Sequence, residues 1–218
     1  METDLPSDPE ARLSDTLHGC GYRCKPAQCL AGLALLMRAA MTTGALVVLA
    51  CAGPVGAQTL TQDEALALAF PGAEVERRTA FLDDTQLARA SSLAGPDVDV
   101  ESTVVTYYVA MRRGEPAGVA YFDVDRVRTL PQVLMIVVGT DGRVVRVETV
   151  SFREPPEYRA PEGWLAQFHG RVLDDQLSLK GAIANITGAT LTSGAVTRAT
   201  RRVMALHSII DPFGVGAR

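Results

Sequence analysis

The stretch Asn185-Ile186-Thr187-Gly188-Ala189-Thr190-Leu191-Thr192-Ser193-Gly194-Ala195-Val196 joins a loop of small and hydroxyl residues to a helical pattern. From Val196 onward, apolar residues recur three or four positions apart, which predicts a helix with one buried face. That face consists of Val196, Ala199, Val203, Leu206 and Ile210. Thr192 or Ser193 is expected to cap the start of the helix, and Asp211-Pro212 is expected to end it.

The residues just before this helix predict an anion site. Thr187 to Thr190 should form a tight loop at the helix N-terminus, where free backbone N–H groups and the helix dipole favour phosphate or another anion. Gly188 and Ala189 would let the backbone approach a ligand closely. The same residue types also form ordinary turns and caps, so the bare pattern fits both interpretations.

Three arginines lie on the opposite side of the predicted helix, at positions 198, 201 and 202. A solvent-facing surface is the expectation for such a run, and contact with phosphate or a partner is the alternative. His169 and His207 stand alone in the sequence and receive no role.

Upstream of the loop, the chain predicts two helices and two β-hairpins. Thr61 should cap a helix over Gln62–Phe70, and Asp83 or Asp84 should cap a second helix that ends at Gly95-Pro96. The expected strands cover residues 74–82, 103–111, 118–124, 133–138 and 143–150. Thr140-Asp141-Gly142 is a strong turn signal between the last two strands. This order predicts a single α+β domain, with an antiparallel sheet of hairpins flanked by helices.

Apolar patterning predicts where individual strands lie. Val133–Val138 is apolar on both faces, which indicates an interior strand. In the next strand Val145 and Val147 alternate with Arg146 and Glu148, which predicts one solvent-facing side. Further along the chain, Trp164, Leu165 and Phe168 predict a short helix that ends near Gly170. Their side chains are expected to pack into the core and not to form a platform for a cofactor ring.

Composition excludes several classes of site. The chain has 21 Lys and Arg against 25 Asp and Glu, for a net charge of −4, and has no basic stripe of the kind that binds nucleic acid. Its cysteines all lie before residue 52, so the folded part is expected to have no disulfide, no Fe–S cluster and no metal site with thiolate ligands. These four residues are Cys20, Cys24, Cys29 and Cys51.

The N-terminal part of the chain predicts export. Residues 37–57 have one basic residue, an apolar run, a Gly-Pro break and a small-x-small ending, which is typical of a cleaved signal peptide. Cleavage is expected after Ala57; an N-terminal membrane anchor or a lipid on Cys51 is the alternative. Residues 1–36 are interpreted as a non-structural or mis-called extension before a true start at Met37. Residues 58–218 are then a periplasmic or other extracytoplasmic domain.

The segment Thr187-Gly188-Ala189-Thr190-Leu191-Thr192-Ser193, followed by a helix, resembles the flavin-attachment motif of the FMN-binding domain family. That family includes the covalent-flavin subunits of the sodium-pumping NADH:quinone oxidoreductase and of the Rnf complex. The resemblance implies that a dedicated flavin transferase attaches FMN to Thr190 through a phosphoester. It also implies that Thr187, Gly188, Ala189, Leu191 and Thr192 form the rest of the cofactor-binding loop in a domain over residues 58–218.

Two further positions bear on this resemblance. Glu154 stands where the family has the Glu of a Glu-Thr-Pro-Gly-like segment that lines the flavin, although Pro155 and Glu157 replace the Thr and the Gly. The alternative for Glu154 is a solvated acid in a loop. The family usually has Asp three positions before Thr187, and this chain has Ala184.

The function implied by the resemblance is electron transfer by a covalently bound flavin. FMN would perform the redox step, Thr190 would be its attachment point, and no residue is expected to be catalytic. The partners would be the flavin transferase and a redox protein or membrane oxidoreductase complex. A flavin-free binding module, favoured by Ala184, is one alternative. Another alternative is an exported Ser/Thr hydrolase that uses His169 or His207 as the base. The sequence has no Gly-x-Ser-x-Gly elbow, which counts against this alternative.

Overall fold

The structure, a computed structural model, describes residues 59–213. The expected extension over residues 1–36 and the expected signal peptide over residues 37–57 lie outside the described residues. No helix within residues 59–213 is long and apolar enough to cross a membrane.

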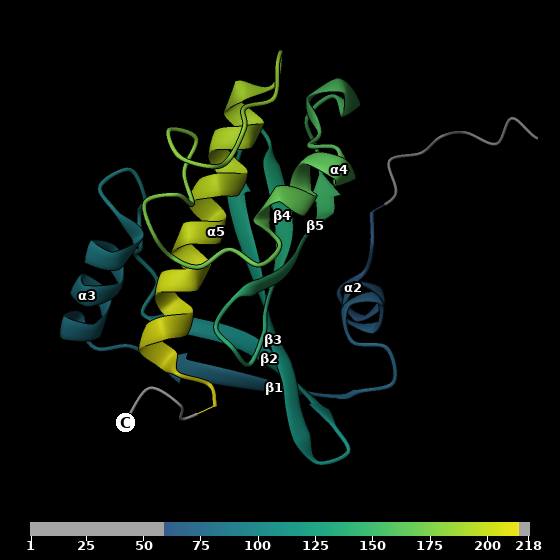
Figure 1. Cartoon of the computed structure of the whole chain (residues 1–218), viewed down its shortest axis with the longest axis vertical. Coiled ribbons are helices and arrows are strands. Elements are labelled where there is room, and N and C mark those ends of the chain that lie inside the picture. Colours follow the sequence, from purple (N-terminus) through teal and green to yellow (C-terminus); the bar gives the residue numbers. More distant parts are fainter. Residues whose placement is uncertain (1–58, 214–218) are drawn as a thin grey trace, which may run out of the picture. The chain divides into compact units, whose positions relative to one another are not determined.

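Five antiparallel strands form one open sheet, and their order across the sheet is their order along the chain (Figure 1). The predicted α+β class with a sheet of hairpins is therefore confirmed. Each strand pairs with its sequence neighbours, so short turns make most of the connections. The strands are β1 (Glu74–Phe81), β2 (Val104–Arg112), β3 (Glu115–Arg126), β4 (Pro131–Val138) and β5 (Val144–Phe152).

The first two helices begin at the predicted caps. Thr61 precedes α2 (Gln62–Ala69) and Asp83 precedes α3 (Asp84–Ala94), and each of the two forms a capping box. In this arrangement the cap side chain and the side chain three residues later satisfy backbone N–H groups that the helix itself leaves unpaired. Gly95 follows α3 with a φ of 97°, a value that suits glycine.

The helices cover both faces of the sheet. In β4, Leu134 and Ile136 pack into a core cluster shared with α3 and α5 (Thr190–Ile210), whereas Met135 and Val137 pack toward α2. β4 is thus buried on both faces, as its apolar run predicted. Figure 1 shows α5 running along the sheet with α3 beside it.

The expected alternation in β5 is wrong at one position. Val138 pairs with Val144 and Val137 pairs with Arg146, so Val145 is an extra residue in a β-bulge. A bulge shifts the side chains that follow to the other face. As a result Val144 and Val147 are buried, while Val145 is 44% exposed.

Helix α5 begins earlier than predicted. The residue before its first turn is Ala189, and no side chain caps the helix. Thr192 and Ser193, the expected caps, are buried inside the first turn and form other hydrogen bonds. The end of the helix agrees with the prediction, because Asp211 takes a left-handed conformation immediately after Ile210. Val196, Ala199, Val203 and Leu206 are buried as predicted.

Candidate functional site

A pocket of about 220 Å³ lies between the β3–β4 turn, the segment after β5 and the start of α5. It contains six of the seven residues that the sequence assigned to the cofactor; only Thr187, which is exposed, does not line it. The lining residues are Val127, Arg128, Glu154, Tyr158, Gly188, Ala189, Thr190, Leu191 and Thr192. A larger cavity, of about 590 Å³, lies between the end of α3, residues 175–181 and the side of α5, and none of the predicted site residues lines it.

The loop before α5 is a tight turn that requires glycine. The Ala189 N–H donates to the carbonyl of Ile186 at 3.1 Å, which closes a β-turn over residues 186–189. Gly188 has a φ of 83°, a conformation that other residues adopt only with strain. No atom lies within 4 Å of the position that a Cβ at Gly188 would occupy, so the requirement is conformational and not steric.

Thr190 is the first residue of α5, and its side chain is exposed at the rim of the pocket. No side chain caps this helix, so the backbone N–H groups of the first turn lack a side-chain acceptor. Unpaired N–H groups and the helix dipole together favour an anion at this position. Leu191, beside Thr190, is 57% exposed.

Thr192 and Ser193 hold the first turn of α5 in place. The Thr192 hydroxyl donates to the carbonyl of Tyr158 at 2.6 Å, and the Ser193 hydroxyl donates to Oδ1 of Asn185. These bonds join the start of the helix to the segment after β5 and to the loop before the turn. Thr192 therefore lines the pocket as a structural residue whose hydroxyl already has a partner.

Glu154 fixes the opposite wall of the pocket. Its Oε1 accepts hydrogen bonds from the Leu130 N–H at 2.7 Å, from the Thr129 N–H at 2.6 Å and from the Thr129 hydroxyl at 3.3 Å. These bonds, those from Leu130 and Thr129 foremost, lower the pKa of Glu154, so the group is a carboxylate at neutral pH. The alternative of a solvated loop acid is wrong, because the residue is only 7% exposed.

Sequence reasoning missed three residues that line the pocket. Val127 and Arg128 lie in the β3–β4 turn, which has no recognisable motif. Tyr158, at the end of the short helix η1 (Pro156–Tyr158), lines the pocket from the other side. The one available signal was that Tyr158 is an aromatic residue four positions after Glu154, which the resemblance had already placed beside the flavin.

Ala184, where the family usually has Asp, is held through its backbone. Its carbonyl accepts from Trp164 Nε1 at 2.6 Å, and its N–H donates to Gln167 Oε1 at 2.8 Å. These side chains come from α4 (Glu162–Leu165) and η2 (Ala166–Phe168), in the region where the sequence predicted a short packed helix. The loop position is thus fixed without a carboxylate at residue 184.

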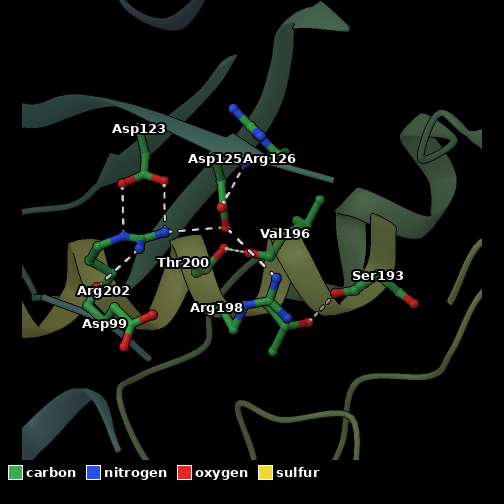
Figure 2. A network of polar contacts seen from close by, with 10 residues as sticks. Asp99, Asp123, Asp125, Arg126, Ser193, Val196, Arg198, Thr200 and Arg202 are labelled. Atoms are coloured by element: carbon green, nitrogen blue, oxygen red, sulfur yellow. Dashed lines mark hydrogen bonds and ion pairs between the residues drawn. The ribbon is translucent and has the colours of Figure 1, made fainter. Parts of the chain in front are cut away.

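The arginines of α5 do not form the expected solvent-facing surface. Arg202 forms two hydrogen bonds with Asp123, at 3.1 and 3.2 Å, and a third with Asp125 at 3.3 Å (Figure 2). Arg198 lies 4.0 Å from Asp125, and Arg201 donates to three backbone carbonyls. Burial raises the pKa of Asp123, although Arg202 opposes this shift. The polar side of α5 is therefore bonded to β3 and to neighbouring loops.

The two described histidines lie away from the pocket. His207 is buried, with its Nδ1 3.0 Å from the Tyr121 hydroxyl, and His169 lies with its Nδ1 2.8 Å from the carbonyl of Val145. A Ser or Thr hydrolase needs a base within hydrogen-bond reach of its nucleophile. Neither histidine lines the pocket that holds Thr190, so this geometry gives the hydrolase alternative no support.

The comparisons with known proteins agree with this geometry. A search of curated proteins found no match to the chain. Residues 131–205 match the family model described as FMN-binding domain, a range that includes Glu154, Tyr158 and the loop from Thr187 to Thr192. Residues 131–205 therefore match the FMN-binding domain that the loop before α5 resembles.

Proposed function

We propose that this protein is an exported electron-transfer protein that carries FMN covalently, through a phosphoester to Thr190. One observation carries the proposal: within the region that matches the FMN-binding domain, the exposed Thr190 opens the uncapped helix α5 and shares a pocket with Glu154. Bound flavin supplies one- and two-electron redox chemistry, and the protein supplies attachment and environment.

In the attachment step, the Thr190 oxygen would form a bond to the phosphorus of the flavin phosphate and would lose its proton to a base on the transferase. Ester formation from FMN itself would release water, which is unfavourable in aqueous solution. The step would balance with a flavin dinucleotide as the donor, because formation of the Thr190 ester would then break the pyrophosphate bond and release a nucleoside monophosphate. No electrons are exchanged in this step.

The pocket fits part of FMN. A volume of about 220 Å³ is below the roughly 300–1,000 Å³ that encloses a whole small ligand. The uncapped start of α5 suits the phosphate, and the exposed Thr190 leaves room for the rest of the cofactor outside the pocket. Such partial enclosure agrees with a tethered carrier, since the covalent bond and not the pocket would retain the cofactor.

Export and partners complete the proposal. The signal-peptide pattern at residues 37–57 supports delivery across the membrane, with an N-terminal anchor as the alternative. A covalent link suits an exported protein, because a dissociated cofactor would be lost to the surroundings. A flavin transferase would load the domain, and a redox protein or a membrane oxidoreductase complex would exchange electrons with it.

A flavin-free binding module on the same fold is the second candidate, and Ala184 is the observation that favours it. The backbone of Ala184 is held by Trp164 and Gln167, while its side chain is exposed. The loop is thus in place without the family's carboxylate, but a transferase that recognises a carboxylate at this position would find none.

The experiment is intact-mass measurement of the exported protein after co-expression with a flavin transferase. We expect an added mass of FMN less one water, and a yellow colour that survives denaturation. Thr190→Val should abolish both. Thr79→Val is the matched control, because it removes an exposed hydroxyl on β1 that lies outside the attachment motif and does not line the pocket, and this variant should still carry flavin.

The same measurement separates the candidates. A folded, colourless protein without added mass, in the presence of a transferase that loads another substrate, would refute the flavin proposal and favour the binding module. Added mass that persists in the Thr190→Val variant would refute the attachment site. The mass of the polypeptide also reports whether the signal peptide was cleaved after Ala57.

A further inference from the structure

We propose that Arg128 is the counter-charge for the phosphate at Thr190 and allows the pocket to accept an anion beside the carboxylate of Glu154. This inference rests on the proposed function and adds a residue to the same site. It assigns to Arg128 a positioning role toward a phosphate group, whether that phosphate is free or belongs to the flavin.

The charges in the pocket raise a problem for an anionic ligand. Among the residues that line it, Glu154 and Arg128 are the two with charged side chains. The backbone hydrogen bonds from Leu130 and Thr129 lower the pKa of Glu154 and keep it negative at neutral pH. A phosphodiester on Thr190 would add a second negative charge to a pocket of about 220 Å³, and two like charges in one small site disfavour each other.

The start of α5 compensates for only part of this charge. A helix N-terminus acts as about half a positive charge, and its effect is confined to the first turn. The Glu154 carboxylate and a phosphate on Thr190 together carry more negative charge than the helix N-terminus can balance. A guanidinium provides a full positive charge and a fork of N–H donors that matches the geometry of phosphate oxygens.

Arg128 is available for this role. Within residues 59–213 it forms no ion pair, and it is exposed at the pocket. By contrast, Arg198 and Arg202 already face Asp125 and Asp123. The turn that holds Arg128 is fixed at its next two residues, because Glu154 accepts the N–H groups of Thr129 and Leu130. Glu154 thus positions the turn that supplies the counter-charge.

The test compares Arg128→Gln with Arg126→Gln in the full exported protein. Arg126 is an exposed arginine two positions earlier in the chain whose side chain does not line the pocket, so its variant makes a similar change in net charge. The first readout is the affinity of flavin-free protein for inorganic phosphate, followed by NMR titration. We expect Arg128→Gln to weaken phosphate binding about three- to tenfold, and Arg126→Gln to leave it unchanged.

The second readout is the rate at which a flavin transferase adds mass to each variant, which we expect Arg128→Gln to slow by a similar factor. Arg128→Lys should restore part of both losses, because it returns the charge without the planar fork. The difference between the wild type and Arg128→Gln should shrink in about 1 M salt, where the screening length falls to about 3 Å.

Equal phosphate affinity and equal loading in Arg128→Gln and the wild type would overturn the inference. Equal losses in Arg126→Gln and Arg128→Gln would also overturn it, because the effect would then be one of general charge. In both cases an FMN adduct on Thr190 would leave the proposed function intact. Absence of the adduct from every sample would refute the proposed function, while the phosphate titration would still decide the role of Arg128.

Discussion

Acidification should destabilise the fold through one buried histidine, His207 on α5. Its side chain is packed against Tyr121 and Phe213, with ring centroids at 5.8 and 6.2 Å, and its Nδ1 lies 3.0 Å from the Tyr121 hydroxyl. Burial lowers the pKa of His207 from 6.5 to about 4, with the charge of Asp211 opposing the shift. The folded protein therefore holds the neutral imidazole over most of the acidic range.

The sign of the effect follows from proton binding. In the unfolded chain His207 takes up a proton as the pH falls through about 6.5, whereas in the folded protein it does so only near pH 4. Between these values the unfolded state binds more protons, so the stabilisation is complete above about pH 6.5 and is lost as the pH falls toward 4. A shift of this size amounts to about 2 to 3 kcal/mol at about pH 4.5, since each pH unit corresponds to about 1.4 kcal/mol.

The assay is urea unfolding of the wild type and of His207→Gln at several pH values from 7 to about 4.5, compared as differences in free energy of unfolding. The glutamine amide does not titrate and can still pair with the Tyr121 hydroxyl. His207→Gln should be less stable than the wild type at pH 7, and this gap should narrow by about 2 to 3 kcal/mol at about pH 4.5. His169→Gln is the control and should follow the wild type, because His169 is exposed. A gap that stays constant with pH would refute the reasoning.

Two further substitutions test the core and the loop. Thr149 is 2% exposed, and its hydroxyl has no hydrogen-bond partner within residues 59–213. Thr149→Val should therefore raise the free energy of unfolding by about 1 kcal/mol, measured by urea titration. A loss of stability would mean that a bound water satisfies this hydroxyl. Gly188→Ala should lower the free energy of unfolding by about 1–2 kcal/mol, because Gly188 has a φ of 83°, and should slow flavin loading measured by intact mass. Gly188→Asn should lose less on both measures, and an unchanged Gly188→Ala protein would contradict the argument from backbone strain.

The sequence was sufficient where structure depends on neighbouring residues. Thr61 and Asp83 act on helices that begin at the next residue, so their capping boxes could be recognised directly. The Thr140-Asp141-Gly142 turn predicted the β4–β5 hairpin, and every strand in this sheet pairs with its neighbour in the chain. Local turn chemistry therefore specified the two predicted hairpins, whereas the chain passes from β1 to β2 through α3. The cofactor loop was visible for the same reason, since the seven consecutive residues from Thr187 to Ser193 carry the resemblance.

Tertiary structure decided the features that depend on distant partners. Val145 became an exposed bulge because of its register against β4, which alternation within one strand cannot reveal. Arg202 became a half-buried ion-pair residue because Asp123, 79 positions earlier in the chain, lies within hydrogen-bond distance of it. The expected caps of α5 were wrong for a related reason: a buried hydroxyl bonds to whichever acceptor lies closest in space, and for Thr192 that acceptor is the carbonyl of Tyr158.

The candidate site combines both kinds of information. By itself the sequence determined an α+β domain with a glycine turn and with Thr190 in the loop just before its last predicted helix. Only the tertiary structure brought the β3–β4 turn with Arg128, the carboxylate of Glu154 and the loop at Thr190 into one pocket. The physical reason is that dihedral preferences and turns act between neighbours in the chain. The charge and enclosure of a pocket arise from side chains that meet only after the sheet and α5 have packed.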